Sequence, residues 1–563
     1  MFLSRETYLK YIKWLLLFSL LEGCTKNNSN NTPPVVSYSF GIQSYSIDGI
    51  SPSNIVHNIS TKPTIKFQFG AAINRADVVS SISLKNNFSN LISYSIAYAN
   101  NDSVVILQPV LPLNYLSKYT VSVSIPLRSS TGTTLSSGIS FSFYTQIDST
   151  DKFPVIADTA LLTLVQKQTF KYFWDFGHPT SGMARERNTS GDVVTTGGTG
   201  FGIMAMLVAI NRGFISRTDG LNRITTITNF LTTKCQRWHG AFSHWVNGAT
   251  GATVAFGNNN GADLVETSYL LEGLLSARQF FNTTDANEKL LRDSINSIWN
   301  NVEWNWFTQN GTQQSLYWQY NPSYTNSADV WSIAINGWNE ALITYVLAAS
   351  SSTHPIAKNV YDVGWASSGK IKNGNSYYGI TLPLGPSYGG PLFFEQYSFI
   401  GINPTSLTDA YANYQTQAIA HTQINYNYCV NNPNQYAGYS NLSWGLTASD
   451  IEGGYTASSP TNDVGVIAPT AAIASMPYTP VPSINALKFF YYKLGDKLWG
   501  NYGFYDAFNL TNPWFATSTL AIDEGPIICM IENYRSGLLW NLFMSCPEIK
   551  NGMKNLGFSS PNL

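Results

Sequence analysis

The spacing of hydrophobic residues changes once along this chain, near residue 153. Before that point, short segments such as 64–69 and 119–123 alternate apolar and polar residues, which is typical of half-buried strands. After it, apolar residues recur every three or four positions, as in 158–174, and this predicts helices. Because 563 residues are too many for one small core, we expect an all-β module followed by a larger all-α domain.

The β module is expected over residues 35–148. Further alternating segments lie at 103–107 and 139–143, with Gly, Asn and Pro between the segments, and this predicts a β-sandwich. The order of TKPTIKFQF, SVVILQP, YTVSVS and FSFYT resembles bacterial Ig-like domains that precede exported enzymes. The module carries no catalytic cluster, so we interpret it as a spacer or accessory module, with glycan binding as the alternative.

The N-terminus reads as a targeting segment. Basic residues precede a short apolar run, 14–21, that ends in Leu-Glu-Gly-Cys, and the run is too short to span a bilayer. Residues 1–23 resemble a bacterial lipoprotein signal, which implies lipidation of Cys24 and an exported protein of the cell envelope, periplasmic or attached to the outer membrane. A plain secretion signal is the alternative. The polar residues 24–34 would then be a tether.

The helical region is expected to hold about a dozen helices. They are predicted at 158–174, 199–211, 216–233, 262–282, 285–302, 337–350, 354–362, 405–423, 465–476, 481–494, 524–537 and 538–545. The long loops between them are 179–198, 305–335, 363–392 and 424–464. Loops of such length in a compact domain are usually functional. We therefore expect an α/α barrel, with two rings of six helices and a cleft made by loops; an α-solenoid would need a repeat that the chain lacks.

Composition narrows the ligand class. Charged residues make up 12% of the chain and the net charge is −1, which argues against a nucleic-acid partner. Aromatic residues reach 14% and favour a neutral, hydroxyl-rich ligand. The cysteines after the signal lack the spacing of a zinc site, and we expect Cys529, within an apolar run, to be a buried thiol. The others are Cys235, Cys429 and Cys546.

The stretch GNNNGADLVET, which runs into the helix at 262–282, places Asp263 and Glu266 at a helix start, just after aromatic residues that include Trp245. Carboxylates beside rings suggest a carbohydrate site. The alternative is purely structural, because Asp at the N-cap with Glu three residues later is a capping-box pattern that starts a helix.

Two further candidates carry the same ambiguity. Arg185 and Arg187 flank a glutamate in the loop 179–198; they could donate hydrogen bonds to a ligand or form a structural ion-pair brace. Glu340 follows a Gly-Trp-Asn turn among apolar residues, where a raised pKa would suit a proton donor. It could also be a first-turn acid favoured by the helix dipole.

Other acids and tryptophans recur where loops meet helices: Trp338, Glu395, Trp444, Asp450 and Asp523. Glycoside hydrolysis needs this set of groups, with one carboxylic acid for the leaving oxygen, one carboxylate to activate water, and flat rings against the sugar.

A set of blocks in the helical region carries a family resemblance: FKYFWDFGHPTSGMARERN, TGGTGFGIMAM, GAFSHWVNGATG, GADLVETSYLLEGLL, INGWNEALITYVLAASS, YGGPLFFEQYSFIG, WGLTASD and IDEGPIICMIENYRSGLLW. Over residues 155–563 the chain resembles the glycoamylase-like domain of glycoside hydrolase family 144, the bacterial β-1,2-glucanases. The resemblance implies an (α/α)6 barrel and inversion at the anomeric carbon, with no metal or organic cofactor. We expect a monomer.

The resemblance also suggests roles. It points to Glu340 as general acid and Asp523 as the base that activates water, with Asp263 and Glu266 binding sugar or positioning the acid. Because Asp263 and Glu266 sit at one helix end, they should lie on one side of the sugar, whereas an inverting pair flanks the bond. Arg185, Arg187, Trp245, Trp338, Glu395, Trp444 and Asp450 are expected to bind substrate or position the acid.

The leading hypothesis is a hydrolase that cleaves β-1,2-glucan to sophorose or short oligosaccharides, acting either within the chain or from its end. One alternative is hydrolysis or transglycosylation of a related β-glucan. The other is a glycan-binding lipoprotein that has lost turnover.

Overall fold

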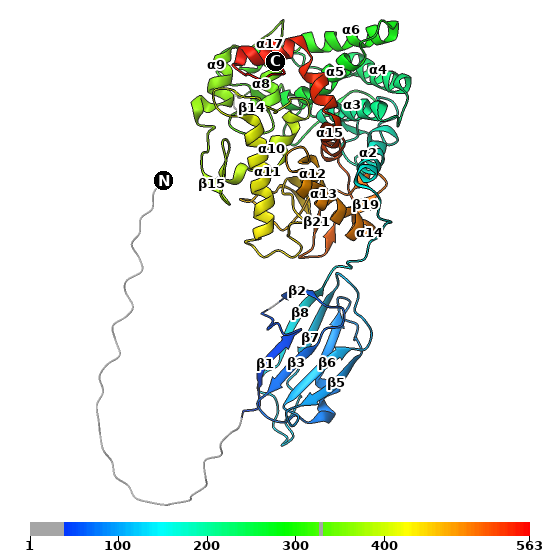
Figure 1. Cartoon of the computed structure of the whole chain (residues 1–563), viewed down its shortest axis with the longest axis vertical. Helices are drawn as coiled ribbons and strands as arrows, with labels where there is room; N and C mark the ends of the chain where they lie inside the picture. The colour runs from blue at the N-terminus through cyan, green and yellow to red at the C-terminus, as the bar shows by residue number, and fades with distance from the viewer. Residues whose placement is uncertain (1–38, 54, 326–329) are drawn as a thin grey trace, which may run out of the picture.

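The computed structural model describes residues 39–53, 55–325 and 330–563. The predicted signal, Cys24 and tether lie outside the described residues. A β-sandwich is followed by a larger helical domain, and Figure 1 shows the sandwich below that domain, joined to it by the segment between β8 and α2. Among the described residues, every helix is too short or too polar to cross a membrane.

The sandwich consists of two four-stranded sheets, in the orders β1-β3-β6-β5 and β2-β8-β7-β4. All neighbours pair antiparallel except β2 with β8. The strands are β1 (Ile42–Ile47), β2 (Ile55–Ile59), β3 (Ile65–Phe69), β4 (Ile82–Asn86), β5 (Tyr94–Ala99), β6 (Val104–Pro109), β7 (Lys118–Val123) and β8 (Ile139–Thr145). In β3, Ile65, Phe67 and Phe69 are buried and the residues between them are not. The predicted alternation is thereby confirmed.

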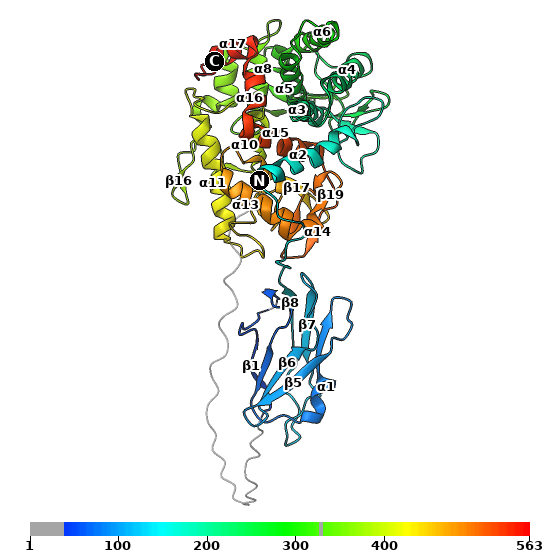
Figure 2. The same cartoon turned by 45° about the vertical axis from the view of Figure 1, so that its right-hand side comes forward.

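The helices of the second domain cover most of the predicted ranges. They are α2 (Asp158–Trp174), α3 (Thr196–Asn211), α4 (Arg217–Thr233), α5 (Leu264–Phe280), α6 (Ala286–Asn300), α8 (Leu342–Ser350), α9 (Lys358–Val360), α10 (Phe393–Gln396), α11 (Tyr414–Asn431), α12 (Pro469–Ala474), α13 (Pro480–Lys488), α14 (Gly495–Leu498), α15 (Ala521–Ser536), α16 (Leu538–Met544) and α17 (Pro547–Leu556). Figure 2 shows α3, α5 and α15 inside the domain, with α4, α6 and α11 at its periphery.

Inner helices follow one another around the domain. α3 packs against α5 and α15, α5 packs against α8, and α12 packs against α15. The short helix η6 (Tyr397–Phe399), which continues α10, contacts α8. On its other side, Gln396 of α10 donates a hydrogen bond to the Ala471 carbonyl of α12, at 3.0 Å. The N-terminal ends of α3, α5, α8 and α15 carry or adjoin most of the acids predicted from the sequence.

Glycine allows α3 and α5 to pack backbone against backbone. A Cβ on Gly200 would lie 2.0 Å from the Tyr269 carbonyl oxygen, and one on Gly273 would lie 2.2 Å from the Gly200 carbonyl oxygen. Larger residues would force the helices apart. This close approach brings Glu266, near the start of α5, within hydrogen-bond distance of the first turn of α3.

Two sequence expectations about the helical domain are wrong. The helix predicted at 405–423 begins at Tyr414, because the Asp409 side chain holds a turn and Asn413 caps α11 by accepting from the Thr416 N–H. The Asn- and Tyr-rich segment up to Asn431, predicted as loop, continues the helix because its buried face packs inside the domain.

The long loops are also more ordered than predicted. The short strands in them are β9 (Val193–Thr195), β13 (Tyr317–Tyr320), β14 (Trp331–Ala334), β15 (Ser376–Tyr377), β16 (Ile380–Thr381), β17 (Ala448–Ile451) and β18 (Gly454–Ala457). Further short strands lie in other connections: β10 (Trp245–Asn247), β11 (Thr253–Val254), β12 (Ala262–Asp263), β19 (Trp499–Gly500), β20 (Gly503–Phe504), β21 (Phe508–Asn509) and β22 (Trp514–Phe515). The four cysteines among the described residues are buried free thiols, in agreement with the expectation for Cys529.

The connector between the two domains is docked on the helical domain. Phe153 stacks on Tyr491 with ring centroids 4.5 Å apart, and the Lys152 N–H donates to the Tyr492 carbonyl at 2.7 Å. Leu116 of the sandwich and Ile147 of the connector pack against the same hydrophobic cluster. The sandwich is thus joined to the helical domain through an ordered segment.

Candidate functional site

Asp263 and Glu266 have different roles at the start of α5. Asp263 is the N-cap: its Oδ1 accepts from the Glu266 N–H at 3.0 Å. Glu266 does not complete a capping box; its Oε2 accepts instead from the Gly197 N–H of α3 at 2.7 Å and from the Thr195 hydroxyl at 3.2 Å. The structural alternative therefore holds for Asp263, whereas Glu266 points into the region between α3 and α5.

His244 joins these two carboxylates. Its Nδ1 lies 2.9 Å from Asp263 Oδ2 and its Nε2 lies 3.9 Å from Glu266 Oε1. Burial opposes the charged ring, but the Glu266 and Asp263 carboxylates outweigh burial and raise the pKa of His244 to about 9. The ring is therefore a cation at neutral pH. Phe256 stacks on it with centroids 3.9 Å apart, and Trp245 meets both rings edge-on.

Glu340 lies two residues before α8, close to the same acids. Its backbone carbonyl accepts hydrogen bonds from the hydroxyls of Ser398 and Tyr269. Burial, with smaller contributions from the Glu266 and Asp263 charges, raises the pKa of the Glu340 carboxyl to about 8. The side chain is consequently protonated at neutral pH, which is the state that a general acid requires.

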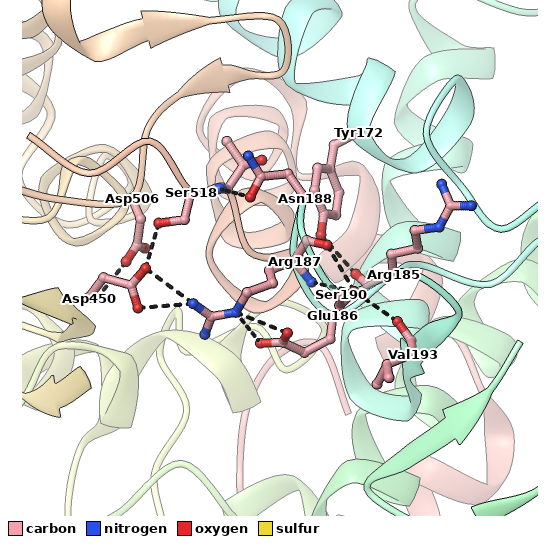
Figure 3. A network of polar contacts seen from close by, with 11 residues as sticks. Tyr172, Arg185, Glu186, Arg187, Asn188, Ser190, Val193, Asp450, Asp506 and Ser518 are labelled. Carbon is pink, nitrogen blue, oxygen red and sulfur yellow. Dashed lines mark hydrogen bonds and ion pairs between the residues drawn. The ribbon is translucent and has the colours of Figure 1, made fainter. Parts of the chain in front are cut away.

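A second group of charges surrounds Arg187 (Figure 3). Its Nε lies 3.0 Å from both carboxylate oxygens of Glu186, and its Nη1 lies 3.2 Å from both oxygens of Asp450. The Ser518 hydroxyl also donates to Asp450. The ion-pair brace considered for this loop exists. It joins Arg187 to its neighbour Glu186 and also to Asp450, which is distant in sequence.

Asp506 extends this group toward α15. Its Oδ2 accepts from the Asp450 N–H at 2.6 Å, and its carboxyl lies next to that of Asp523, the third residue of α15. Burial and the charge of Asp450 raise the pKa of Asp506 to about 7, and burial and Asp506 raise the pKa of Asp523 well above its usual range. Two adjacent carboxyls of this kind titrate as a coupled pair, in which ionisation of one makes ionisation of the other harder.

Tyrosines lie between the two groups. Tyr455 is paired with Asp450 across the β17–β18 hairpin, so both side chains lie on one face of the hairpin. Almost half of the Tyr455 surface, 49%, is open to solvent. Dense protein around its hydroxyl and the nearby Asp523 and Asp506 carboxyls raise the pKa of Tyr455 well above its usual range. The pKa of Tyr397 is raised by burial and by Asp523, and Glu340 contributes in the same direction, so this ring adjoins both acids.

Three of the residues predicted to bind substrate or position the acid have buried side chains that a ligand does not reach. Trp338 is buried against Trp365 and Phe399, because the Gly337 turn tucks its ring beneath the loop. Trp444 is wholly buried, and its indole N–H donates to the Pro482 carbonyl.

The third, Glu395, is inaccessible to solvent and accepts from the Thr422 hydroxyl at 3.0 Å. None of the three side chains is open to a ligand.

Arg185 also lies apart from the charged group. Its guanidinium stacks over Phe176, 4.5 Å from the ring centre, and its Nη1 donates to the Phe176 carbonyl at 3.0 Å. In Figure 3 its side chain points away from that of Arg187. It therefore stabilises its own loop and contacts none of the acids.

Sequence reasoning missed His244, Asp506 and Glu186 as members of the site. His244 lies between two marked features, the aromatic cluster and the capping pattern. Its contact with Asp263 depends on the segment before β10 meeting β12, where the Asp263 N–H donates to the Phe242 carbonyl at 2.7 Å. Asp506, in Tyr-Asp-Ala, has no local signal at all; only tertiary structure brings it to Asp523. Among the described residues no group of three His, Cys, Asp or Glu side chains has the arrangement of a metal site.

Comparison with known families agrees with this arrangement of domains. Residues 332–547 match the family model named Glycoamylase, described as "Putative glucoamylase", and residues 43–145 match the bacterial Ig-like domain model.

Comparison with individual proteins gives close matches. The chain is 45% identical over 424 residues to an exo β-1,2-glucooligosaccharide sophorohydrolase (non-reducing end) of Parabacteroides distasonis, covering 71% of this chain and 58% of that protein. It therefore spans less than two thirds of the length of that relative.

Two solved structures are similar. An endo-β-1,2-glucanase from Chitinophaga pinensis, solved as a sophorotriose and glucose complex, is 47% identical, with a TM-score of 0.70, and the match covers 73% of this chain and 100% of that chain. A β-1,2-glucanase from Parabacteroides distasonis is 35% identical, with a TM-score of 0.69, and the match covers 92% of this chain and 73% of that chain.

Proposed function

Because this chain belongs to the glycoamylase-like family of β-1,2-glucan hydrolases, with a bacterial Ig-like domain before the helical domain, we propose that it hydrolyses β-1,2-glucan to sophorose or short oligosaccharides. The observation that carries the proposal is the placement of two kinds of acid in one site: Glu340, whose pKa is raised to about 8, and the adjacent carboxyls of Asp506 and Asp523. One can give a proton and the other can accept one.

Inversion by single displacement uses these groups in turn. Glu340 donates its proton to the glycosidic oxygen as that bond breaks. The Asp523 carboxylate, in its pair with Asp506, takes a proton from water as the water attacks the anomeric carbon on the opposite face. The raised pKa of Glu340 is what an acid needs near neutral pH, and ionisation of one carboxyl of the Asp506–Asp523 pair supplies the negative charge for the base.

The remaining site residues hold and orient the sugar. Asp263 and Glu266, fixed by the His244 cation and by the α3 backbone, form the wall beside Glu340. Arg187 and Asp450 form the wall beside Asp523, and Tyr455 offers a half-exposed ring on that side. Trp245 is packed against His244 and Phe256 with part of its ring exposed, and it extends the first wall.

We also propose that the inner helices and those around them form an (α/α)6 barrel. Support comes from the succession of contacts from α3 through α5, α8, η6 with α10, α12 and α15 back to α3. In this arrangement the helix ends that carry Asp263, Glu340 and Asp523 face a common site.

The test is to incubate the purified protein with linear β-1,2-glucan and to separate the products by size. We expect sophorose or short β-1,2-linked oligosaccharides, and NMR should show the α-anomer forming first. Preferential cleavage of a β-1,3- or β-1,4-glucan would contradict the proposed substrate. Net retention of the anomeric configuration would rule out single displacement. Sophorose released alone from the start would identify chain-end action, whereas a spread of sizes would identify cleavage within the chain.

A lipid anchor at Cys24 and a place in the cell envelope, with the protein acting as a monomer, complete the proposal. The anchor and the location rest on the N-terminal sequence alone. Mass spectrometry of the membrane fraction should find an acylated Cys24, and Cys24→Ala should release the protein into the soluble fraction; an unmodified N-terminus in the fluid outside the membranes would contradict the anchor.

A further inference from the structure

A cavity of ≈ 330 Å³ opens beside the charged group around Arg187. It lies between the β17–β18 hairpin and the β21–β22 hairpin. Its lining consists of Arg187, Asn188, Thr189, Asp450, Ile451, Gly454, Trp514, Phe515, Ala516, Thr517 and Ser518. The lining combines aromatic rings, hydroxyls and one guanidinium, a mixture that matches the alternating faces of a sugar ring.

The two rings of the lining differ in what they contact. Phe515 stacks on Phe508, with centroids 6.0 Å apart. Trp514, partly exposed, makes no ring contact with any described residue. Stacking on another ring therefore accounts for Phe515, whereas Trp514 is partly exposed at the cavity and has no ring partner among the described residues.

The polar side of the cavity has an unused donor. Arg187 donates from Nε to Glu186 and from Nη1 to Asp450, but its Nη2 has no hydrogen-bond partner among the described residues. The exposed Thr189 and Thr517 hydroxyls lie on the rim. A guanidinium held by two carboxylates is well oriented to donate to a hydroxyl oxygen.

The cavity adjoins the base side of the proposed reaction. Asp450 lines it, and the Asp450 N–H donates to Asp506 at 2.6 Å. Asp506 in turn lies against Asp523. A sugar bound in the cavity would be separated from the reacting unit by Asp450 and its hairpin, which suits a neighbouring unit of the same chain.

We propose that this cavity is a saccharide subsite that binds one glucosyl unit of the β-1,2-glucan away from the cleaved bond. The indole of Trp514 stacks on the C–H face of the sugar, and Arg187 Nη2 donates to a hydroxyl. The volume lies at the small end of ligand pockets, which span about 300–1,000 Å³, so it fits one ring. The inference rests on the proposed function and adds a determinant of chain-length preference.

Binding should be measured without turnover. In the Glu340→Gln background, calorimetry with linear β-1,2-glucooligosaccharides of increasing length gives the length at which affinity stops rising. Adding Trp514→Leu should weaken binding of the longest ligands by about tenfold or more, the effect of one lost stacking contact of roughly 1.4 kcal/mol, and the affinity should stop rising at a shorter length. Trp514→Phe should recover most of the affinity. Tyr534→Ala, a half-exposed tyrosine at the far end of α15, is the matched control and should change nothing.

A second variant covers the case in which Trp514→Leu fails to fold. Thr517→Trp adds bulk from the exposed rim and should block the cavity, with the same loss of affinity for long ligands. Equal affinity of all these variants for every length would overturn the subsite. Because binding is read in a variant without the acid, this result is distinct from failure of the proposed function, which would appear as absence of cleavage by the unmodified protein.

Discussion

The carboxylates of the sandwich and those of the candidate site in the helical domain lie in opposite environments. In the sandwich, Asp77 pairs with Arg128 and Asp102 pairs with Arg75, at the surface and at 2.7–2.8 Å. Hydrogen bonds from the arginines lower the pKa of both aspartates. At the candidate site Asp523 is buried and Glu340 is half-buried, and their removal from water raises the pKa of both carboxyls.

This difference in pKa separates acids that stabilise the fold from acids that can exchange a proton. A paired surface acid stabilises the fold slightly and has no chemistry to perform. An enclosed acid with a raised pKa costs free energy of folding, because ionisation is easier in the unfolded chain. Acids with a strongly raised pKa are often found where the proton itself takes part in a reaction. In this chain such acids lie in the helical domain.

The largest effect is expected from removing the two proton-transfer groups. Glu340→Gln and Asp523→Asn should each lower the turnover of β-1,2-glucan by roughly a hundredfold to ten-thousandfold, the usual contribution of general acid–base catalysis. Steady-state rates with oligosaccharide binding checked by calorimetry measure this. Turnover near that of the unmodified protein in either variant would move the role to another carboxyl, with Asp506 the first candidate for the base.

The same Glu340→Gln variant that lowers turnover should be thermally more stable than the unmodified protein at alkaline pH. Folding raises the pKa of Glu340 from 4.5 to about 8, so between these values the folded state binds more protons and its stability falls as pH rises. Glu340→Gln removes this loss. Its Tm should therefore exceed that of the unmodified protein at pH 8 and approach it near pH 4.5; an equal deficit at both pH values would contradict enclosure of the acid.

The pH range over which kcat/KM is high should be narrow. Glu340 must keep its proton, so activity should fall as pH rises through about 8. The Asp506–Asp523 pair must carry a negative charge, so activity should fall as pH drops through about 7, the pKa of Asp506. Asp506→Asn should shift the acid limb and leave the alkaline limb in place; no shift would place the base elsewhere.

A smaller effect is expected at Glu395, which matches Glu340 in type but not in location. Both glutamic acids have a pKa raised by burial, but Glu395 is wholly buried and accepts a hydrogen bond from Thr422, so its carboxyl is closed to a ligand. Glu395→Gln should change kcat/KM by less than about twofold while Glu340→Gln abolishes most turnover, because only contact with the reacting atoms matters to the rate. A comparable loss of kcat/KM in the two variants would show that Glu395 also contributes to the site.

The smallest effect is expected in the sandwich. Arg128→Ala breaks the bond to Asp77, but solvent already screens that pair. Thermal unfolding and activity on glucan should both match those of the unmodified protein. A clear fall in activity would mean that the sandwich communicates with the site.

The sequence allowed the fold to be predicted where the information was local. The alternation in β3 and the apolar spacing of α2 and α15 each depend on a single element, and these predictions agree with the structure. The 405–423 helix was misplaced because the Asp409 turn and the Asn413 cap outweigh an ambiguous apolar pattern. The segment that ends α11 is rich in Asn and Tyr, which predict loops, and tertiary burial decides its structure.

The site was most predictable where a residue stands at a helix start. Asp263, Glu266 and Asp523 stand at such positions, and the structure brings Asp263 and Glu266 near Glu340. Trp338 and Trp444 illustrate the limit, since an indole before a helix can face the solvent or the core, and the sequence around it is the same in both cases. Asp506 belongs to the site only because β20, β21 and α15 meet.

The docked connector determines where this chain can be divided. Phe153 covers Tyr491, and Lys152 donates to the Tyr492 carbonyl, so residues preceding α2 belong physically to the helical domain. A shortened protein that starts at Asp158 would expose an aromatic surface and should aggregate, whereas one that starts at Ser149 keeps the hydrogen bond from Lys493 to its carbonyl. The natural unit for crystallising the helical domain alone therefore includes about ten residues that contain no helix or strand.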